Sequence, residues 1–155
     1  MMLAGMVLPG MTRFARRIFL LIEILAAGGA LVSSVSLYHH YGTSATSYCD
    51  IGESFNCDIV NRSTYSAISG VPVALIGIIG YLVLLVLATF HRSKAETPAM
   101  LAIAALAGLG FALYLTYIEG FVLAAWCVLC LSSLTLIFCI TVLSLLLWAR
   151  SARRT

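Results

Sequence analysis

Two pairs of cysteines are the residues of this chain whose types and spacing favour chemistry. Cys127 and Cys130 form a Cys-x-x-Cys motif, and Cys49 and Cys57 flank a short acidic segment that contains Gly52. Residues three apart on a helix share one face, so the first pair can open and close a disulfide. The second pair can also meet, because the cost of closing a loop rises only slowly with its length. Both pairs therefore predict thiol–disulfide exchange, in which a thiolate attacks a disulfide.

The Cys-x-x-Cys motif stands inside a long apolar run. The chain of 155 residues is 62% hydrophobic and 10% charged, whereas a soluble domain carries about 25% charge. The expected spans are residues 18–37, 71–90, 99–118 and 121–148, with residues 38–70 as a polar redox loop between the first two. Each run has roughly the 20 residues that cross a bilayer. The sequence predicts one all-α integral membrane domain over residues 1–155, a four-transmembrane-helix bundle with Cys127 about two turns inside the fourth helix.

The basic residues predict the orientation of this bundle. Three precede the first span, two lie between the second and third, and three follow the fourth, which leaves one of nine elsewhere. Short cytoplasmic loops collect Lys and Arg. Both termini are therefore expected in the cytoplasm, and loop 38–70 outside it, on the oxidising side of a bacterial membrane. The net charge of +3 is explained by topology, so no nucleic-acid partner is expected.

Two cysteine pairs on one side of the membrane, at two depths, indicate an electron relay. The pair in the polar loop can meet a soluble protein, and the pair in the apolar run can meet a lipid-soluble oxidant, most simply a quinone. The sequence leaves the pKa of Cys127 open. A helix N-terminus stabilises a thiolate, whereas low-dielectric surroundings disfavour it.

Three other interpretations fit parts of the sequence. Glu23 in the first span is typical of small four-span transporters, and a carboxylate at membrane depth is a candidate functional residue. The four paired cysteines could instead bind Zn²⁺ as thiolates, or could be inert parts of a helical scaffold. Cys139 is the fifth cysteine and is expected to be a buried structural residue.

Taken together, the cysteine spacing and its surroundings resemble the vitamin K epoxide reductase family, in its bacterial branch without a fused thioredoxin domain. The motifs are Cys49-x7-Cys57, Ser63 six residues later, Gly70-Val71-Pro72 at the start of a span, and the late Cys127-x-x-Cys130. The resemblance implies a four-helix bundle around a quinone, either menaquinone or ubiquinone. It also implies a quinone-dependent oxidoreductase of the bacterial inner membrane that reoxidises a separate, extracytoplasmic DsbA-like (thioredoxin-like) protein and so supports disulfide formation.

The resemblance also assigns roles to the four paired cysteines. Cys49 is expected to exchange with the partner protein, and Cys57 to attack the buried pair. Cys127 is expected to receive that attack, and Cys130 to face the quinone. No metal is expected in this site.

Four further positions follow from the same comparison or from their neighbourhood. The hydroxyl of Ser63 is expected to orient a thiol or the quinone, with capping of a short helix as the alternative. Trp126, next to Cys127, is expected either to line the quinone site or to anchor the chain at the membrane interface. Animal members bind the quinone through an Asn and a Tyr, and the corresponding positions here hold Val73 and Leu134, which carry no such role.

Overall fold

The computed structural model describes residues 13–42, 55–91 and 94–153. Within these residues, the long helices are α1 (Arg13–Tyr41), α3 (Val73–Phe90), α4 (Thr97–Ile118) and α5 (Val128–Ala152). All four spans, with α4 continuing to Leu123, are long and apolar enough to cross a membrane. The predicted all-α membrane bundle is therefore confirmed. Cys49 and most of the acidic segment lie outside the described residues.

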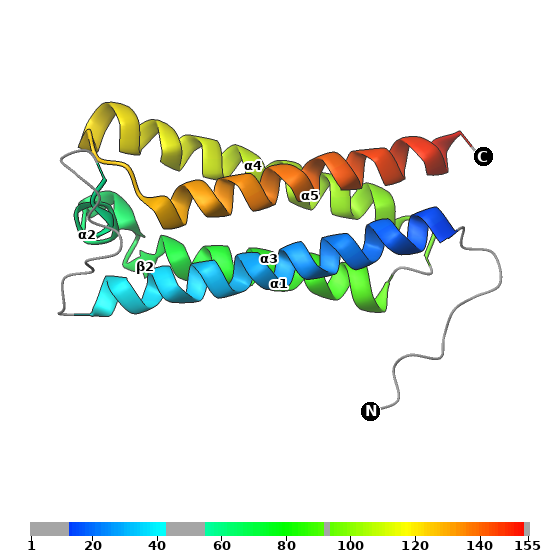
Figure 1. Cartoon of the computed structure of the whole chain (residues 1–155), viewed down its shortest axis with the longest axis horizontal. Coiled ribbons are helices and arrows are strands. Elements are labelled where there is room, and N and C mark those ends of the chain that lie inside the picture. Colours follow the sequence, from blue (N-terminus) through cyan, green and yellow to red (C-terminus); the bar gives the residue numbers. More distant parts are fainter. Residues whose placement is uncertain (1–12, 43–54, 92–93, 154–155) are drawn as a thin grey trace.

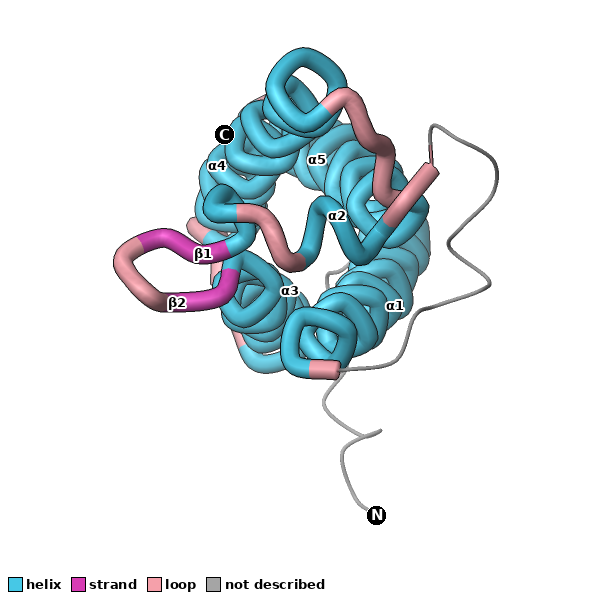
Figure 2. The backbone as a smooth tube through the Cα atoms, turned by 90° about the vertical axis from the view of Figure 1, so that its left-hand side faces the viewer, coloured by secondary structure: helices cyan, strands magenta, loops and turns pink. Residues whose placement is uncertain are grey.

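The four long helices form a ring in the order α1, α3, α4, α5, because α1 packs on α3 and α5 while α4 packs on the same two helices (Figure 2). The beginning of α1 and the end of α5 lie at one end of this bundle, as the blue and red ribbons of Figure 1 show. At the other end lie α2 (Cys57–Asn61), the short 3₁₀ helix η1 (Thr64–Ser66) and the antiparallel pair β1 (Ala67–Ile68) and β2 (Val71–Pro72). In the end-on view α2 crosses the mouth of the ring (Figure 2), so α2 covers that end of the bundle.

The turn between β1 and β2 explains the Gly-Val-Pro sequence that opens the second span. Ser69 and Gly70 both have positive φ angles, of +52° and +83°, and glycine adopts this conformation without a steric cost. Pro72 then precedes Val73, the first residue of α3. Proline lacks an N–H group, and a helix start is where that loss matters least.

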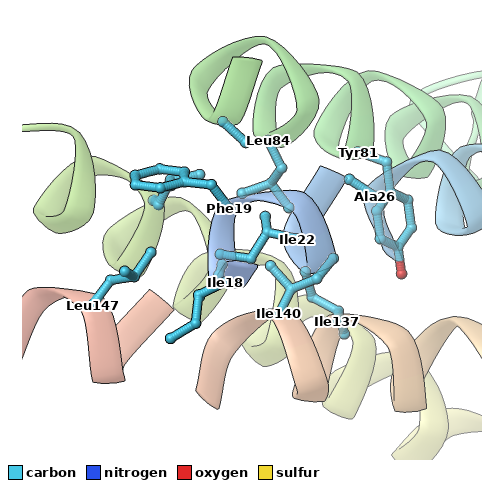
Figure 3. Close-up of a cluster of buried hydrophobic side chains, with 12 residues drawn as sticks. Ile18, Phe19, Ile22, Ala26, Tyr81, Leu84, Ile137, Ile140 and Leu147 are labelled. Atoms are coloured by element: carbon cyan, nitrogen blue, oxygen red, sulfur yellow. The ribbon is translucent and has the colours of Figure 1, made fainter. Parts of the chain in front are cut away.

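The core of the bundle is built by apolar side chains of α1 that face the other helices. Figure 3 shows Ile18, Phe19, Ile22 and Ala26 of α1 among Leu84, Ile137, Ile140 and Leu147. Tyr81 of α3 crosses the same core, and its hydroxyl donates to the carbonyl oxygen of Ser133 on α5 at 2.8 Å. The Tyr81 ring lies directly against Gly29 of α1, where a Cβ atom would approach its Cε1 to 2.2 Å. Close approach of α1 and α3 therefore depends on glycine at position 29.

The start of the fourth span differs from the sequence prediction. The π-helical segment η2 (Glu119–Leu123) continues α4, and Ala124 then takes a left-handed conformation with φ +49°. Cys127 is extended and is the N-cap residue of α5. The Cys-x-x-Cys motif therefore begins at the N-terminal end of α5. Cys127 does not lie about two turns inside the fourth helix, as predicted. The apolar run from residue 121 gave no signal of this break, because the turn is made by Ala124 and not by glycine or proline.

Candidate active site

The contact between α2 and the segment before α5 positions the cysteines. Asn56 is the N-cap residue of α2, and its Oδ1 accepts the N–H of Ile59 at 3.0 Å. The backbone N–H of Asn56 donates to the carbonyl oxygen of Trp126 at 3.1 Å. The residues that follow these two are Cys57 and Cys127, so this backbone bond sets the two cysteines side by side.

The sulfur atoms of Cys57 and Cys127 lie 3.3 Å apart. Cys57 is disulfide-bonded, whereas Cys127 is a free thiol. Their residues are 1% and 0% exposed, and Val60 and Ala125 complete the surrounding apolar cluster. A thiol thus lies beside a disulfide sulfur in a dry site, which is the arrangement that thiol–disulfide exchange needs.

The pKa of the Cys127 thiol is lowered, so the structure decides a direction that the sequence left open. The main cause is the hydrogen bond from the Cys130 thiol. Burial opposes this effect, while the backbone N–H groups of Cys130 and Leu129 at the start of α5 support it. The nearby Glu119 carboxylate raises the pKa but does not reverse the outcome. A larger fraction of Cys127 is therefore ionised at neutral pH than of an ordinary cysteine, and exchange proceeds through the thiolate.

Glu119 is a member of the site for which the sequence patterns predicted no role. Its residue is 1% exposed, and its Oε2 accepts the backbone N–H of Cys127 at 3.1 Å. The Cys130 thiol hydrogen-bonds to the same carboxylate. A carboxylate between two strongly apolar runs, in a chain with six acidic residues, was the signal that could have drawn attention to it.

A cavity of about 410 Å³ lies inside the ring next to Cys130, within the size range of small-molecule sites. Cys130 and Glu119 are on its wall. Most of the remaining wall is apolar and comes from all four long helices, including Val32, Ala74, Leu84, Phe111, Leu115 and Ile137. The cavity therefore suits a flat apolar molecule that must reach the Cys130 sulfur.

Asn61, at the end of α2, gives this cavity a polar contact that the sequence patterns did not predict. Its residue is 6% exposed and lines the cavity. The Oδ1 atom accepts the hydroxyl of Ser36 at 2.8 Å, whereas Nδ2 has no acceptor in the part of the chain that the structure describes. A buried amide donor without an acceptor is costly. It fits a bound molecule that offers a hydrogen-bond acceptor such as a carbonyl oxygen.

Ser63 and Trp126 differ in their relation to this cavity. Ser63 lies on its wall, and its hydroxyl donates to the carbonyl oxygen of Val60 at 2.8 Å instead of capping η1. Trp126 is not among the lining residues. Its indole packs on Gly120, where a Cβ atom would lie 3.0 Å from Cη2. The structure therefore brings Ser63, but not Trp126, to the wall of this cavity.

Cys139 and Glu23 lie away from the site. Cys139 is a free thiol on α5 that is only half-buried, and not buried as predicted, and neither residue lines the cavity. The transporter interpretation thus gains no support from the position of Glu23. The zinc interpretation needs four thiolates, whereas Cys57 is held in a disulfide.

Residues 20–145 match the model of the Vitamin K epoxide reductase family. The matched stretch runs from α1 into α5 and contains all five cysteines of the chain.

Proposed function

The chain belongs to the vitamin K epoxide reductase family and is a membrane thiol–disulfide oxidoreductase, and from that premise we propose its electron path. Two electrons enter from a reduced, extracytoplasmic DsbA-like protein at Cys49 and Cys57. They pass to Cys127 and Cys130 and leave to a membrane quinone. The net reaction forms one disulfide in the partner protein and reduces the quinone to hydroquinone. The distance of 3.3 Å between the Cys57 and Cys127 sulfurs is the observation that carries this proposal.

The exchange between the two pairs starts from a disulfide between Cys127 and Cys130. The Cys57 thiolate attacks the Cys127 sulfur, the bond between Cys127 and Cys130 breaks, and Cys130 leaves as a thiolate. The Cys49 thiolate then attacks Cys57 and releases the Cys127 thiolate. The loop pair ends as a disulfide and the buried pair as a dithiol, so two electrons have moved inward. Cys57 in a disulfide beside the free thiols of Cys127 and Cys130 corresponds to this product state.

The cavity supports a quinone as the electron acceptor of the Cys127 and Cys130 dithiol. A bound quinone takes up two electrons and two protons. Cys130 is on the cavity wall, and the Nδ2 of Asn61 is a buried donor suited to a quinone carbonyl oxygen. Asn61 thus provides the polar contact to the quinone that the apolar side chains of Val73 and Leu134 cannot make. The Ser63 hydroxyl donates its hydrogen bond to the carbonyl oxygen of Val60. The Ser63 oxygen can therefore still accept a hydrogen bond from a hydroxyl group of the hydroquinone.

The orientation in the bacterial inner membrane follows from charge. Arg13 begins α1 and Arg150 lies in the last turn of α5, and these ends lie together at the end of the bundle opposite α2 (Figure 1). Cytoplasmic ends collect basic residues. We therefore place both termini in the cytoplasm and α2, with the cysteine pairs, toward the extracytoplasmic partner.

Single replacements in purified protein test this path. With a reduced thioredoxin-like protein as donor and decylubiquinone or menadione as acceptor, Cys127→Ala and Cys130→Ala should abolish quinone reduction. Cys139→Ala is the matched control and should retain full activity. Cys57→Ala should block the protein donor while small dithiols still reduce the buried pair. Full activity of Cys130→Ala would disprove the proposed roles.

A disulfide map gives an independent test without quinone. In Cys130→Ala the thiolate of Cys127 has no resolving thiol beside it, so it should form a stable mixed disulfide with Cys57. Mass spectrometry of non-reduced peptides detects that bond. Its absence, with the loop disulfide intact, would contradict transfer between Cys57 and Cys127.

A further inference from the structure

Glu119 is a fully buried acidic residue that lies beside Cys127 and lines the cavity together with Cys130. Its residue is 1% exposed, and burying a carboxylate is costly unless it is paired or protonated. It sits at the end of the span formed by α4 and η2, where acidic residues are rare and usually serve function.

Glu119 contacts the backbone of Cys127 and the side chain of Cys130. Oε2 accepts the N–H of Cys127 at 3.1 Å, which fixes the carboxylate against the start of α5. The Cys130 thiol hydrogen-bonds to the same group. The other oxygen, Oε1, is buried and has no N–H or O–H donor among the residues described, and Glu119 lines the cavity together with Cys130. One carboxylate therefore contacts a reacting thiol and faces the space assigned to its oxidant.

A purely structural role accounts for only part of this arrangement. A glutamine at position 119 could accept the N–H of Cys127 equally well and could be buried at lower cost. What a glutamine lacks is the ability to take up and release a proton. The contact with the Cys127 N–H therefore does not explain why position 119 holds an acid that can bind and release a proton.

We propose that Glu119 is a catalytic acid–base residue that carries the proton of the Cys130 sulfur, an inference that rests on the proposed electron path. When Cys57 attacks Cys127, the departing Cys130 thiolate takes a proton from the Glu119 carboxyl group. When the dithiol is reoxidised, the Cys130 thiol returns that proton to Glu119 as its sulfur forms the bond to Cys127. Two electrons and two protons reach the quinone in each cycle, and Glu119 passes on the proton that it takes from Cys130. The two protons that Cys49 and Cys57 lose as they form their disulfide restore the Glu119 carboxyl group and supply the second proton.

The first test measures turnover in a Cys139→Ala background. With the thioredoxin-like donor and decylubiquinone, Glu119→Gln should lower kcat by about 100-fold, which is the size of a lost general acid–base contribution. The KM values for both substrates should stay near those of the parent protein. Glu119→Asp retains a carboxyl group and should recover part of the loss. Thermal unfolding of each variant in detergent identifies those that fold. Wild-type kcat in a folded Glu119→Gln variant would overturn the proposal.

The second test needs neither quinone nor a folded variant. Infrared difference spectra between the dithiol and disulfide states, set with dithiothreitol and its oxidised form in quinone-free protein, report the protonated carboxyl band. A band that changes with the redox state and shifts on ¹³C-glutamate labelling supports Glu119 as the proton carrier. Its absence overturns this inference. If instead the band is present but quinone reduction is not, the proposed electron acceptor fails and the acid–base role stands.

Discussion

Replacing Gly29 with alanine tests the packing that holds the cavity wall in place. A Cβ atom at position 29 would lie 2.2 Å from Cε1 and 2.4 Å from Cζ of Tyr81. These atoms belong to a rigid ring, so the ring itself must move. The hydroxyl of Tyr81 would then leave Ser133, and both residues line the cavity. Gly29→Ala should therefore affect both stability and the quinone site.

The size of the effect follows from three contributions. Overpacking a core costs about 1–3 kcal/mol, and losing the hydrogen bond from Tyr81 costs about 1 kcal/mol more. Replacing glycine by alanine inside a helix returns about 1 kcal/mol. The net loss in free energy of unfolding is about 1–3 kcal/mol by combining these values.

Gly28 provides a matched control on the same helix, because a Cβ atom there meets nothing within 4 Å. Gly28→Ala should gain up to about 1 kcal/mol. Titration with a denaturing detergent, followed by circular dichroism, measures both variants, and quinone KM should rise only in Gly29→Ala. Equal stability of the two variants would refute the reasoning from the Tyr81 contact.

Three other outcomes are expected. Because the pKa of Cys127 is lowered, the rate of its alkylation, which burial slows at every pH, should keep its high-pH value below the ordinary thiol pKa of about 8.5 and fall only as the pH drops through the lowered value; a profile centred at the ordinary value contradicts this. Asn61→Leu should weaken binding of a quinone by roughly 5-fold, one neutral hydrogen bond, as measured by fluorescence quenching, and unchanged affinity argues against the Nδ2 contact. Asn56→Ala removes the cap of α2 at about 1 kcal/mol and should lower the yield of the Cys57–Cys127 mixed disulfide trapped in Cys130→Ala.

The sequence was sufficient for the membrane bundle because the relevant signal is local. A run of about 20 apolar residues specifies a spanning helix whatever its neighbours are, since its backbone bonds are all internal. The exact start of α5 was not predictable in this way. Ala124 and Cys127 lie in a continuous apolar run, and their non-helical conformations come from the packing of this turn against α2.

The candidate site also combines features that the sequence predicts with features that depend on tertiary packing. The types and spacing of Cys57, Cys127 and Cys130 in the sequence indicated exchange chemistry. That Cys57 and Cys127, 70 positions apart, have adjacent sulfurs depends on α2 crossing the mouth of the bundle. Asn61 could not be assigned from sequence, because a lone amide has no spacing pattern to mark it, and for Glu119 the only signal was the rarity of an acid between two apolar runs.

Sequence by itself determined four spanning helices and a dithiol chemistry, and its charge distribution predicts their orientation, because hydropathy, charge and motif spacing are read along the chain. Tertiary structure alone decided which sulfur meets which, the lowered pKa of Cys127 and the presence of a carboxylate beside Cys130. Those properties are sums over neighbours that are distant in sequence, and only the packed bundle brings these neighbours together.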